Sequence, residues 1–422
     1  MTRTLLLYMS RKTIRVLLVS WCFASSPAAA QEETSEEKKT ASTRQETLRR
    51  KREEKAKELE PHKVTSTEAR IRGFEKIKFP QNIFVKGWRG LRPVIGGMPS
   101  GSGFVLGGGY VHGLENQYFL FQANGRYSTK GYTTADAEIV YPTPQEQRRF
   151  EIKGRTEYRN LTSLHFFGIG NDTSHDDEQT YLLNDRSAYS HFWLNPRGLL
   201  SFGAQVGWYS AETGPGDDEE PEDTLTDRGL PGFGIPRNDF GVAGGWVEFD
   251  LRDKWEEPPV GIEARVTALR FEDLDGNNFD FTRIVADVKG YIPLGYRNRI
   301  LALRFRTSHS DRESGSLVPF YMMETLGGAK NLRGFDEFRF RDRRNFLLSV
   351  EYRWEVWAFV DMTVFVDTGK VFSDMDDFNF EDLHTGYGFG LRIHTPGGFR
   401  MRFDLARSAE GVKFHVSAGP SF

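Results

Sequence analysis

Apolar and polar side chains alternate with a period of two residues along most of the chain after about residue 80. The stretch FLLSVEYRWEVW, residues 346–357, illustrates the pattern: one set of alternate positions is apolar and aromatic, and the other is mainly charged. The same alternation recurs in residues 283–291, 385–394 and 399–407. A period of two predicts β-strands that carry one apolar and one polar face.

Fifteen such strands are clear, and segment 83–97 supplies a sixteenth, which gives the even number usual in bacterial single-chain barrels. The predicted strands are 83–97, 103–114, 117–129, 132–142, 149–159, 179–195, 198–211, 239–251, 261–272, 279–291, 299–308, 345–357, 359–371, 385–394, 398–407 and 412–422. The long connections all follow odd-numbered strands, and tight turns such as LEN, NPRG and YRN follow even-numbered ones. The long connections are 160–178, 212–238, 309–344 and 372–384. This arrangement is typical of outer-membrane barrels.

The charged face of each strand decides between two all-β folds. A soluble sandwich turns its apolar face inward, but such sheets seldom need aromatic flanks on so many strands of about nine to twelve residues. A membrane barrel turns the apolar face to lipid and encloses a polar lumen. No run of about eighteen apolar residues is present that could form a membrane helix. We therefore predict a 16-stranded antiparallel transmembrane β-barrel over residues 79–422.

Composition narrows the function classes. The chain has 43 Gly, 34 Phe and 15 Tyr residues and a formal net charge of -3. A nucleic-acid partner is not expected, because such binding needs a basic excess. The only cysteine, Cys22, lies in the segment that we expect to be removed on export, so no disulfide is expected in the mature protein.

The N-terminal region predicts export and a separate polar segment. In residues 1–30, basic residues precede the apolar stretch VLLVSWCFA, and small residues stand at Ala28 and Ala30, as in a cleaved signal peptide. A lipoprotein signal at Cys22 is disfavoured, because Trp21 stands where a small residue is needed. Residues 31–78 mix both charge signs with few apolar residues and predict a charged periplasmic helix or linker, serving as a tether or as a docking helix.

One segment interrupts the alternation between two strands. The stretch GGAKNLRGFDEFRFRD, residues 327–342, is too long and too charged for a hairpin turn. It contains the motif Leu332, Arg333, Gly334 and Phe335, and a second motif, FVDTG, supplies Phe365, Asp367 and Gly369. Further stretches are FFGIGND, FDLRDKWEEPPVG, YIPLG and GLRIHTPGGFRMRFDLAR. Together these motifs resemble the barrel domain of the BamA/TamA superfamily, the bacterial surface antigen domain.

The resemblance implies that loop 327–342 folds into the lumen and that Arg333 pairs there with Asp367 and Glu351. The alternation agrees, because both acidic residues fall on the polar face of their strands. A guanidinium held by two carboxylates in a poorly solvated lumen is a strong charge-assisted contact. Two roles stay open: an anchor that only holds the barrel's shape, or an anchor that positions a lateral gate.

The last strand, GVKFHVSAGPSF, directs Phe414, Val416 and Phe422 toward lipid. Pro420 cannot donate a ladder hydrogen bond, so pairing at this edge is weakened. The resemblance implies two uses of this strand. It is a sorting signal read by the host barrel-assembly machinery, or a seam that opens to clients by strand addition.

The resemblance further implies a role in biogenesis of the cell outer membrane of Gram-negative type, by protein insertion, assembly or translocation. The expected partners are outer-membrane lipid, lipopolysaccharide, the host barrel-assembly machinery and a client outer-membrane or exported protein. Relatives that insert proteins carry POTRA domains before the barrel, whereas only the charged segment 31–78 occupies that position here, so we expect a short form that lacks them. The alternative is a passive channel-forming or structural barrel.

No enzymatic activity, cofactor or metal site is predicted. The sequence HSD, residues 309–311, lacks an identifiable nucleophile. Residues 273–278, DLDGNN, lack the ligand spacing of a calcium loop, and the histidines show no metal-ligand spacing. The acidic stretch 216–224 predicts a solvated extracellular loop, with weak divalent-cation binding as the alternative.

Overall fold

The structure is a computed structural model. It describes residues 83, 87–99, 101–113, 118–142, 149–196, 198–217, 224–226, 229–253, 260–357, 360–394 and 400–419. Internal contacts divide the chain into residues 1–70 and 71–422, and all described residues lie in the second unit. The predicted signal peptide (1–30), the charged segment (31–78) and Phe422 lie outside the described residues and stay predictions.

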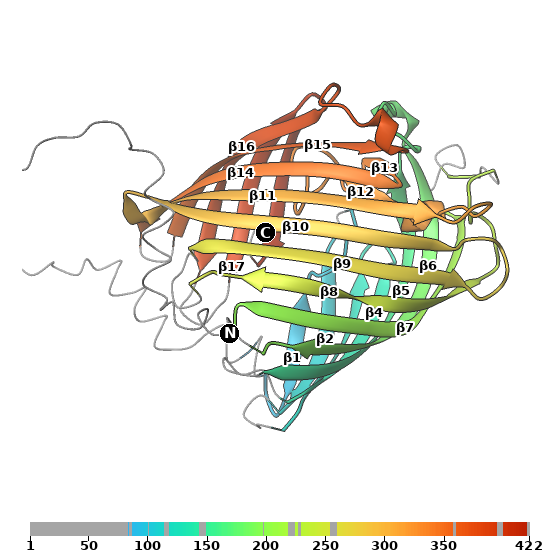
Figure 1. The fold of residues 1–422 in the computed structure, drawn as a ribbon, viewed down its shortest axis with the longest axis horizontal. Helices are drawn as coiled ribbons and strands as arrows, with labels where there is room; N and C mark the ends of the chain where they lie inside the picture. Colours follow the sequence, from blue (N-terminus) through green and yellow to red (C-terminus); the bar gives the residue numbers. More distant parts are fainter. Residues whose placement is uncertain are drawn as a thin grey trace, which may run out of the picture. The chain divides into compact units, whose positions relative to one another are not determined.

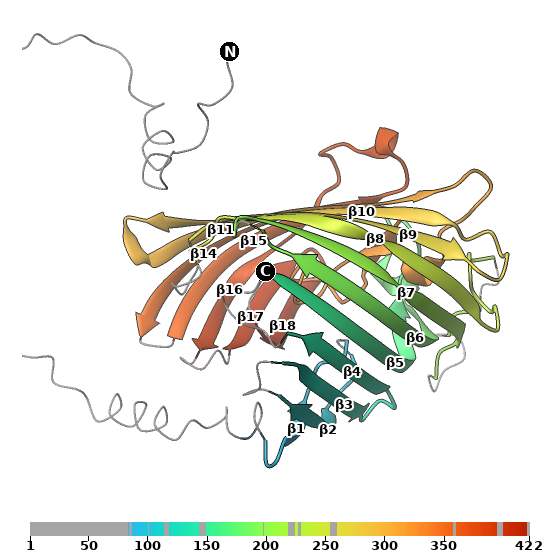
Figure 2. The ribbon, with the colours of Figure 1, turned by 60° about the horizontal axis from the view of Figure 1, so that its bottom comes forward.

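Sixteen strands form one antiparallel sheet, as the alternation predicts (Figure 1). They are β1 (Leu91–Ile95), β2 (Val105–His112), β3 (Leu120–Ser128), β4 (Thr133–Tyr141), β5 (Phe150–Phe166), β6 (Gln179–Leu194), β7 (Leu200–Pro215), β8 (Asn238–Asp250), β9 (Gly261–Asp273), β10 (Phe281–Leu294), β11 (Tyr296–Arg312), β14 (Arg344–Trp357), β15 (Val360–Phe372), β16 (His384–His394), β17 (Arg400–Ser408) and β18 (Gly411–Ala418). Figure 2 shows that the sheet is strongly curved and encloses an interior.

The connection between β11 and β14 carries secondary structure of its own. It contains the 3-10 helix η4 (Phe320–Met322) and a small separate sheet of β12 (Glu324–Leu326) and β13 (Phe340–Asp342). Two further 3-10 helices, η2 (His175–Asp177) and η5 (Met375–Asp377), lie in other long connections. None of the helices in the described part of the chain is long and apolar enough to cross a membrane.

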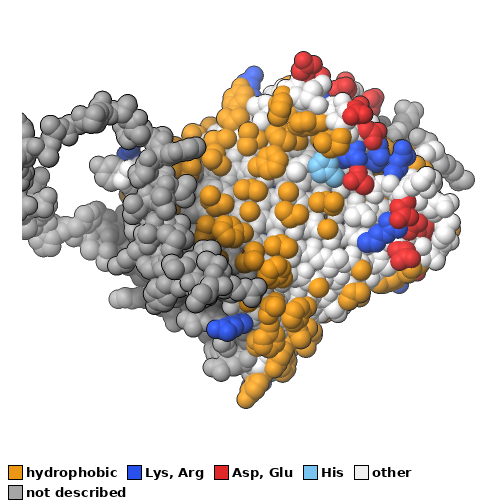
Figure 3. All heavy atoms as spheres, viewed as in Figure 1, with side chains coloured by type: hydrophobic (Ala, Val, Ile, Leu, Met, Phe, Trp, Pro, Cys, Tyr) orange, Lys and Arg blue, Asp and Glu red, His pale blue; other side chains and the backbone are white. Residues whose placement is uncertain are grey.

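The two faces of the sheet have the polarity that a lipid environment requires. On β15, Val364 and Val366 are 45% and 46% exposed, whereas Asp367, next along the strand, is completely buried. The apolar side chains therefore point away from the enclosed interior, and the charged ones point into it. Figure 3 shows hydrophobic side chains spread over the outer side of the strands, with charged side chains gathered toward the end that carries the long connections. This is the inverse of a soluble sandwich.

Three strands extend further than the sequence predicts, so the loops that follow them begin later than expected. Strands β5, β7 and β11 continue to Phe166, Pro215 and Arg312, whereas the sequence predicts loops from residues 160, 212 and 309. In the β5 extension the inward residues, such as Leu161 and Phe166, are apolar and pack against the interior loop, whereas the β7 and β11 extensions are mainly polar and bury Thr213 and Ser310. The alternation that marks a lipid-facing strand is therefore lost there, although the backbone stays extended.

The interior at this end is filled by a hydrophobic core. Leu161 and Phe166 of β5 and Tyr181 of β6 pack with Phe320 of η4 in one cluster of buried residues. The rings of Tyr181 and Phe320 lie 4.9 Å apart, edge to face. The β11–β14 connection thus supplies the aromatic residue around which strands β5 and β6 close.

Candidate functional site

The β11–β14 connection lies inside the curved sheet and touches strands from both halves of the chain. Arg341 Nη2 donates to the hydroxyl of Tyr181 on β6, at 3.2 Å. Arg339 Nε donates to Glu410 Oε1 in the β17–β18 turn, at 2.7 Å. Because residues only two positions apart contact β6 and the last hairpin, the loop must cross the interior.

Arg333 is the most completely bound residue of this loop. Its Nε and Nη2 donate to the two oxygens of Asp367 at 2.6 and 2.9 Å, so this contact is bidentate. Its Nη1 donates to Glu351 Oε2 at 2.8 Å. Arg333 is 2% exposed, and both carboxylates are fully buried. Burial alone would lower the pKa of Arg333, but the two carboxylates raise it, so the guanidinium is charged.

Phe365 supplies an aromatic platform for the same guanidinium. The centre of its ring lies 3.5 Å from Arg333 Cζ. Phe365 is the cross-strand partner of Glu351, and antiparallel partners point to the same face of a sheet. The two other motif residues of the FVDTG stretch, Asp367 and Gly369, follow at intervals of two residues and therefore face the interior as well. A stacked, bidentate site selects arginine over lysine.

Three further charged residues extend the site, and sequence reasoning missed all of them. Arg353 Nε donates to Glu351 Oε1 at 2.7 Å. Arg392 Nη1 donates to Asp404 Oδ1 at 2.6 Å, and Asp404 Oδ1 also lies 3.9 Å from Arg333 Nη1. The buried cluster thus joins β14, β15, β16 and β17 through alternating charges. Each missed residue lies on the polar face of its strand. The alternation therefore predicts which face the side chain is on, but it does not predict the ion-pair partner.

Glycines let the loop backbone approach the strands closely. A Cβ atom on Gly386 of β16 would lie 1.7 Å from the carbonyl oxygen of Arg333. Gly334 has φ of 98°, in the left-handed region that favours glycine, and its carbonyl accepts a 2.6 Å hydrogen bond from Ser408 Oγ of β17. On either side of this turn, Leu332 and Phe335 are buried in a cluster with Phe340. The motif LRGF therefore combines two hydrophobic anchors, one turn and one ionic anchor.

The remaining predicted residues lie as follows. Phe414 and Val416 of β18 are 65% and 53% exposed on the apolar face, and Phe422 is outside the described residues. A Cβ on Gly369 would lie 2.7 Å from the carbonyl oxygen of Phe346. The turn at 273–278 uses its first carboxylate as a cap: the Asp273 oxygens accept from the backbone N–H groups of Asp275 and Phe279.

Comparison with known proteins agrees with this architecture. Residues 234–422 match the Omp85 superfamily domain. BamA from Haemophilus ducreyi lacking POTRA domains 1-3 has 15% sequence identity and a TM-score of 0.58, over 79% of this chain and 71% of that chain. CdiB from Escherichia coli has 12% identity and a TM-score of 0.51, over 79% of this chain and 61% of that chain. At such low identity the two solved structures indicate the fold only.

The predicted resemblance to BamA/TamA barrels is thereby confirmed. The match covers the strands from β8 onward, and it includes the interior loop and the whole Arg333 cluster. Residues 234–422 match the Omp85 superfamily domain, and the sixteen-stranded sheet to which they belong has the fold of the BamA barrel.

Proposed function

We propose that this protein is an outer-membrane barrel that acts in outer-membrane biogenesis, by inserting, assembling or translocating a client protein. The observation that carries the proposal is the Arg333 cluster, which fixes an interior loop to strands β14 and β15 and reaches β17. Of these strands, β17 pairs with β18, the C-terminal edge strand of the sheet. A loop tied to the edge region can transmit a change in the lumen to that edge.

The short edge strands support a lateral seam as the place of action. Strand β1 has five residues and β18 has eight, whereas β5 has 17. Pro93 lies between the β1 positions that bond to β2, so its missing N–H removes a donor from the outer edge of β1 and leaves the β1–β2 ladder intact. Opening at a seam breaks few backbone hydrogen bonds when the strands beside it are short. An incoming strand could replace those bonds by pairing with the freed edge.

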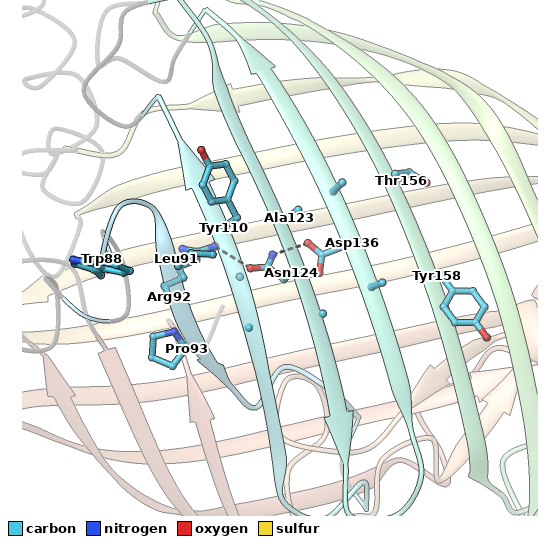
Figure 4. Close-up of a pocket in the computed structure, with 15 residues that line it drawn as sticks. Trp88, Leu91, Arg92, Pro93, Tyr110, Ala123, Asn124, Asp136, Thr156 and Tyr158 are labelled. Carbon is cyan, nitrogen blue, oxygen red and sulfur yellow. Dashed lines mark hydrogen bonds between the residues drawn. The ribbon is translucent and has the colours of Figure 1, made fainter.

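The outer surface beside β1 has few large side chains. A hollow of about 840 Å³ lies over β1 to β5, and Leu91 and Tyr110 at its rim are 57% and 38% exposed (Figure 4). Small residues line it at the positions that pair with Tyr110 across the strands: Ala123, Ala137 and Thr156. Few large side chains would therefore have to move when this edge of the sheet is displaced.

Side chains on the inner face hold these first strands together. Arg92 Nη2 donates to Asn124 Oδ1 at 3.1 Å, and Asn124 Nδ2 donates to Asp136 Oδ2 at 2.8 Å, as Figure 4 shows. The chain of contacts runs from β1 across to β4. These contacts hold the short strand β1 in the sheet although its backbone ladder is short.

Depletion of the protein in intact cells tests the proposal. We expect the outer-membrane level of at least one client protein to fall, measured by quantitative proteomics of isolated outer membranes. The mRNA level of the same client should be unchanged. Unaltered protein and lipid profiles after complete depletion would contradict the proposal and favour a passive barrel.

A further inference from the structure

The structure brings together three residues with metal-binding side chains that lie far apart in the sequence. His175 belongs to η2 in the β5–β6 connection, Asp336 to the interior loop, and Glu410 to the β17–β18 turn. One ligand atom from each lies within 4.8 Å of the others, and all three residues are partly buried. Each comes from a separate segment at the end of the sheet that carries the long connections.

The donor atoms have capacity for an ion. His175 Nε2 and Asp336 Oδ2 already lie 3.0 Å apart. Glu410 uses Oε1 for Arg339, but its Oε2 is screened from solvent and has no hydrogen-bond partner among the described residues. A buried carboxylate oxygen without a partner is costly, and a cation would remove that cost.

Two basic side chains adjoin the cluster, and they differ in mobility. Arg339 is held at three points: Glu410 Oε1, and Thr173 Oγ1 and carbonyl oxygen at 2.8 and 2.6 Å. Among the described residues, Lys413 donates only to Asp336 Oδ2, at 2.7 Å, from a side chain that is 30% exposed. Lys413 can therefore swing into solvent and give its place to another cation. Arg339 would remain and neutralise part of the ligand charge.

We propose that His175, Asp336 and Glu410 form a binding site for a divalent transition-metal ion, with Zn²⁺ as the probe. One imidazole and two carboxylates suit zinc, which takes three protein ligands and a water in open sites. Lys413 occupies the site when the ion is absent and leaves it when the ion binds. The bound ion pins the interior loop to the β5–β6 connection on one side and to the last hairpin on the other.

Zinc titration of the purified full-length protein in detergent tests the site. We expect one Zn²⁺ per chain by isothermal titration calorimetry, and at least a tenfold weaker affinity in His175→Gln, Asp336→Asn and Glu410→Gln. His112→Gln, an exposed histidine on β2, is the matched control and should bind zinc like the parent. Heat-modifiable migration on gels checks that every variant is folded.

Lys413→Met separates a metal site from a simple ion-pair network. Because it removes the competing cation, this variant should bind zinc at least threefold more tightly than the parent. An ion-pair network alone predicts no zinc binding in either protein. The proposal is overturned if the parent protein binds no zinc, if His175→Gln binds it equally well, or if Lys413→Met weakens binding.

Discussion

At the scale of single residues, the arrangement around Arg333 explains why the chain uses arginine there. The guanidinium satisfies two buried carboxylates and stacks on Phe365 at the same time. An ammonium group has no planar fork and cannot make these contacts together. Shortening Arg333 would be costly, because Asp367 would stay buried without the cation that binds it. Glu351, in contrast, would keep Arg353.

Arg333→Ala should therefore lower the free energy of unfolding by about 3–5 kcal/mol. Arg333→Lys should restore only part of that loss. Urea unfolding in detergent micelles, followed by tryptophan fluorescence, measures both. Arg155→Ala is the control: its side chain is 43% exposed beside Glu157, and it should change stability by less than about 1 kcal/mol. Equal losses in Arg333→Ala and Arg155→Ala would contradict the assignment of a buried anchor.

Gly386 makes a second prediction at this scale. An added methyl group would meet the Arg333 carbonyl oxygen at 1.7 Å, so Gly386→Ala should push the loop away from β16. We expect faster trypsin cleavage after Lys330 in the folded protein. Gly290→Ala on β10 is the matched control, because its methyl group would meet nothing within 4 Å. Unchanged cleavage in Gly386→Ala would contradict the close packing of the loop against β16.

At the scale of elements, the interior loop docks on the last hairpin partly through Asp336. Burial opposes ionisation of this carboxyl, but hydrogen bonds from Lys413 and His175 lower its pKa below the usual value. A lowered pKa in the folded state means that the contact stabilises docking fully above the ordinary carboxyl pKa of about 4. The contribution is lost as the pH falls further, through the lowered pKa.

Loop protection should consequently decrease on acidification below about pH 4. Hydrogen exchange of the loop amides as a function of pH measures it. Asp336→Asn should show weaker protection at neutral pH and a smaller acid-induced change. If the parent and Asp336→Asn had the same pH profile, Asp336 would not contribute to docking of the loop.

The elements also show how far alternation predicts structure. It gives all sixteen barrel strands and assigns Glu351 and Asp367 to the inner face. It misses the outer end of β5, because the inner positions there are apolar and pack against the interior loop. It misses the outer ends of β7 and β11, because these short stretches have few apolar residues on either face. It also cannot pair Arg392 with Asp404 or bring His175 to Asp336, since those contacts depend on register and loop path. The sequence therefore indicates which residues are charged, but not which of them contact one another.

At the scale of the whole molecule, the interior loop and its hydrophobic core occupy the lumen at one end of the sheet. A planar bilayer containing the parent protein should show low conductance with rare openings. Arg333→Ala should open more often, because the loop loses its ionic anchor. A steady open pore that is the same in both proteins would indicate that the loop is no plug.

On the function that we propose, the Arg333-anchored loop is needed for outer-membrane biogenesis. Complementation of depleted cells tests it most directly, with outer-membrane client levels measured by quantitative proteomics. We predict that Arg155→Ala restores client levels, whereas Arg333→Ala does not, although it is folded and present in the outer membrane in equal amount. Full restoration by folded Arg333→Ala would contradict the account.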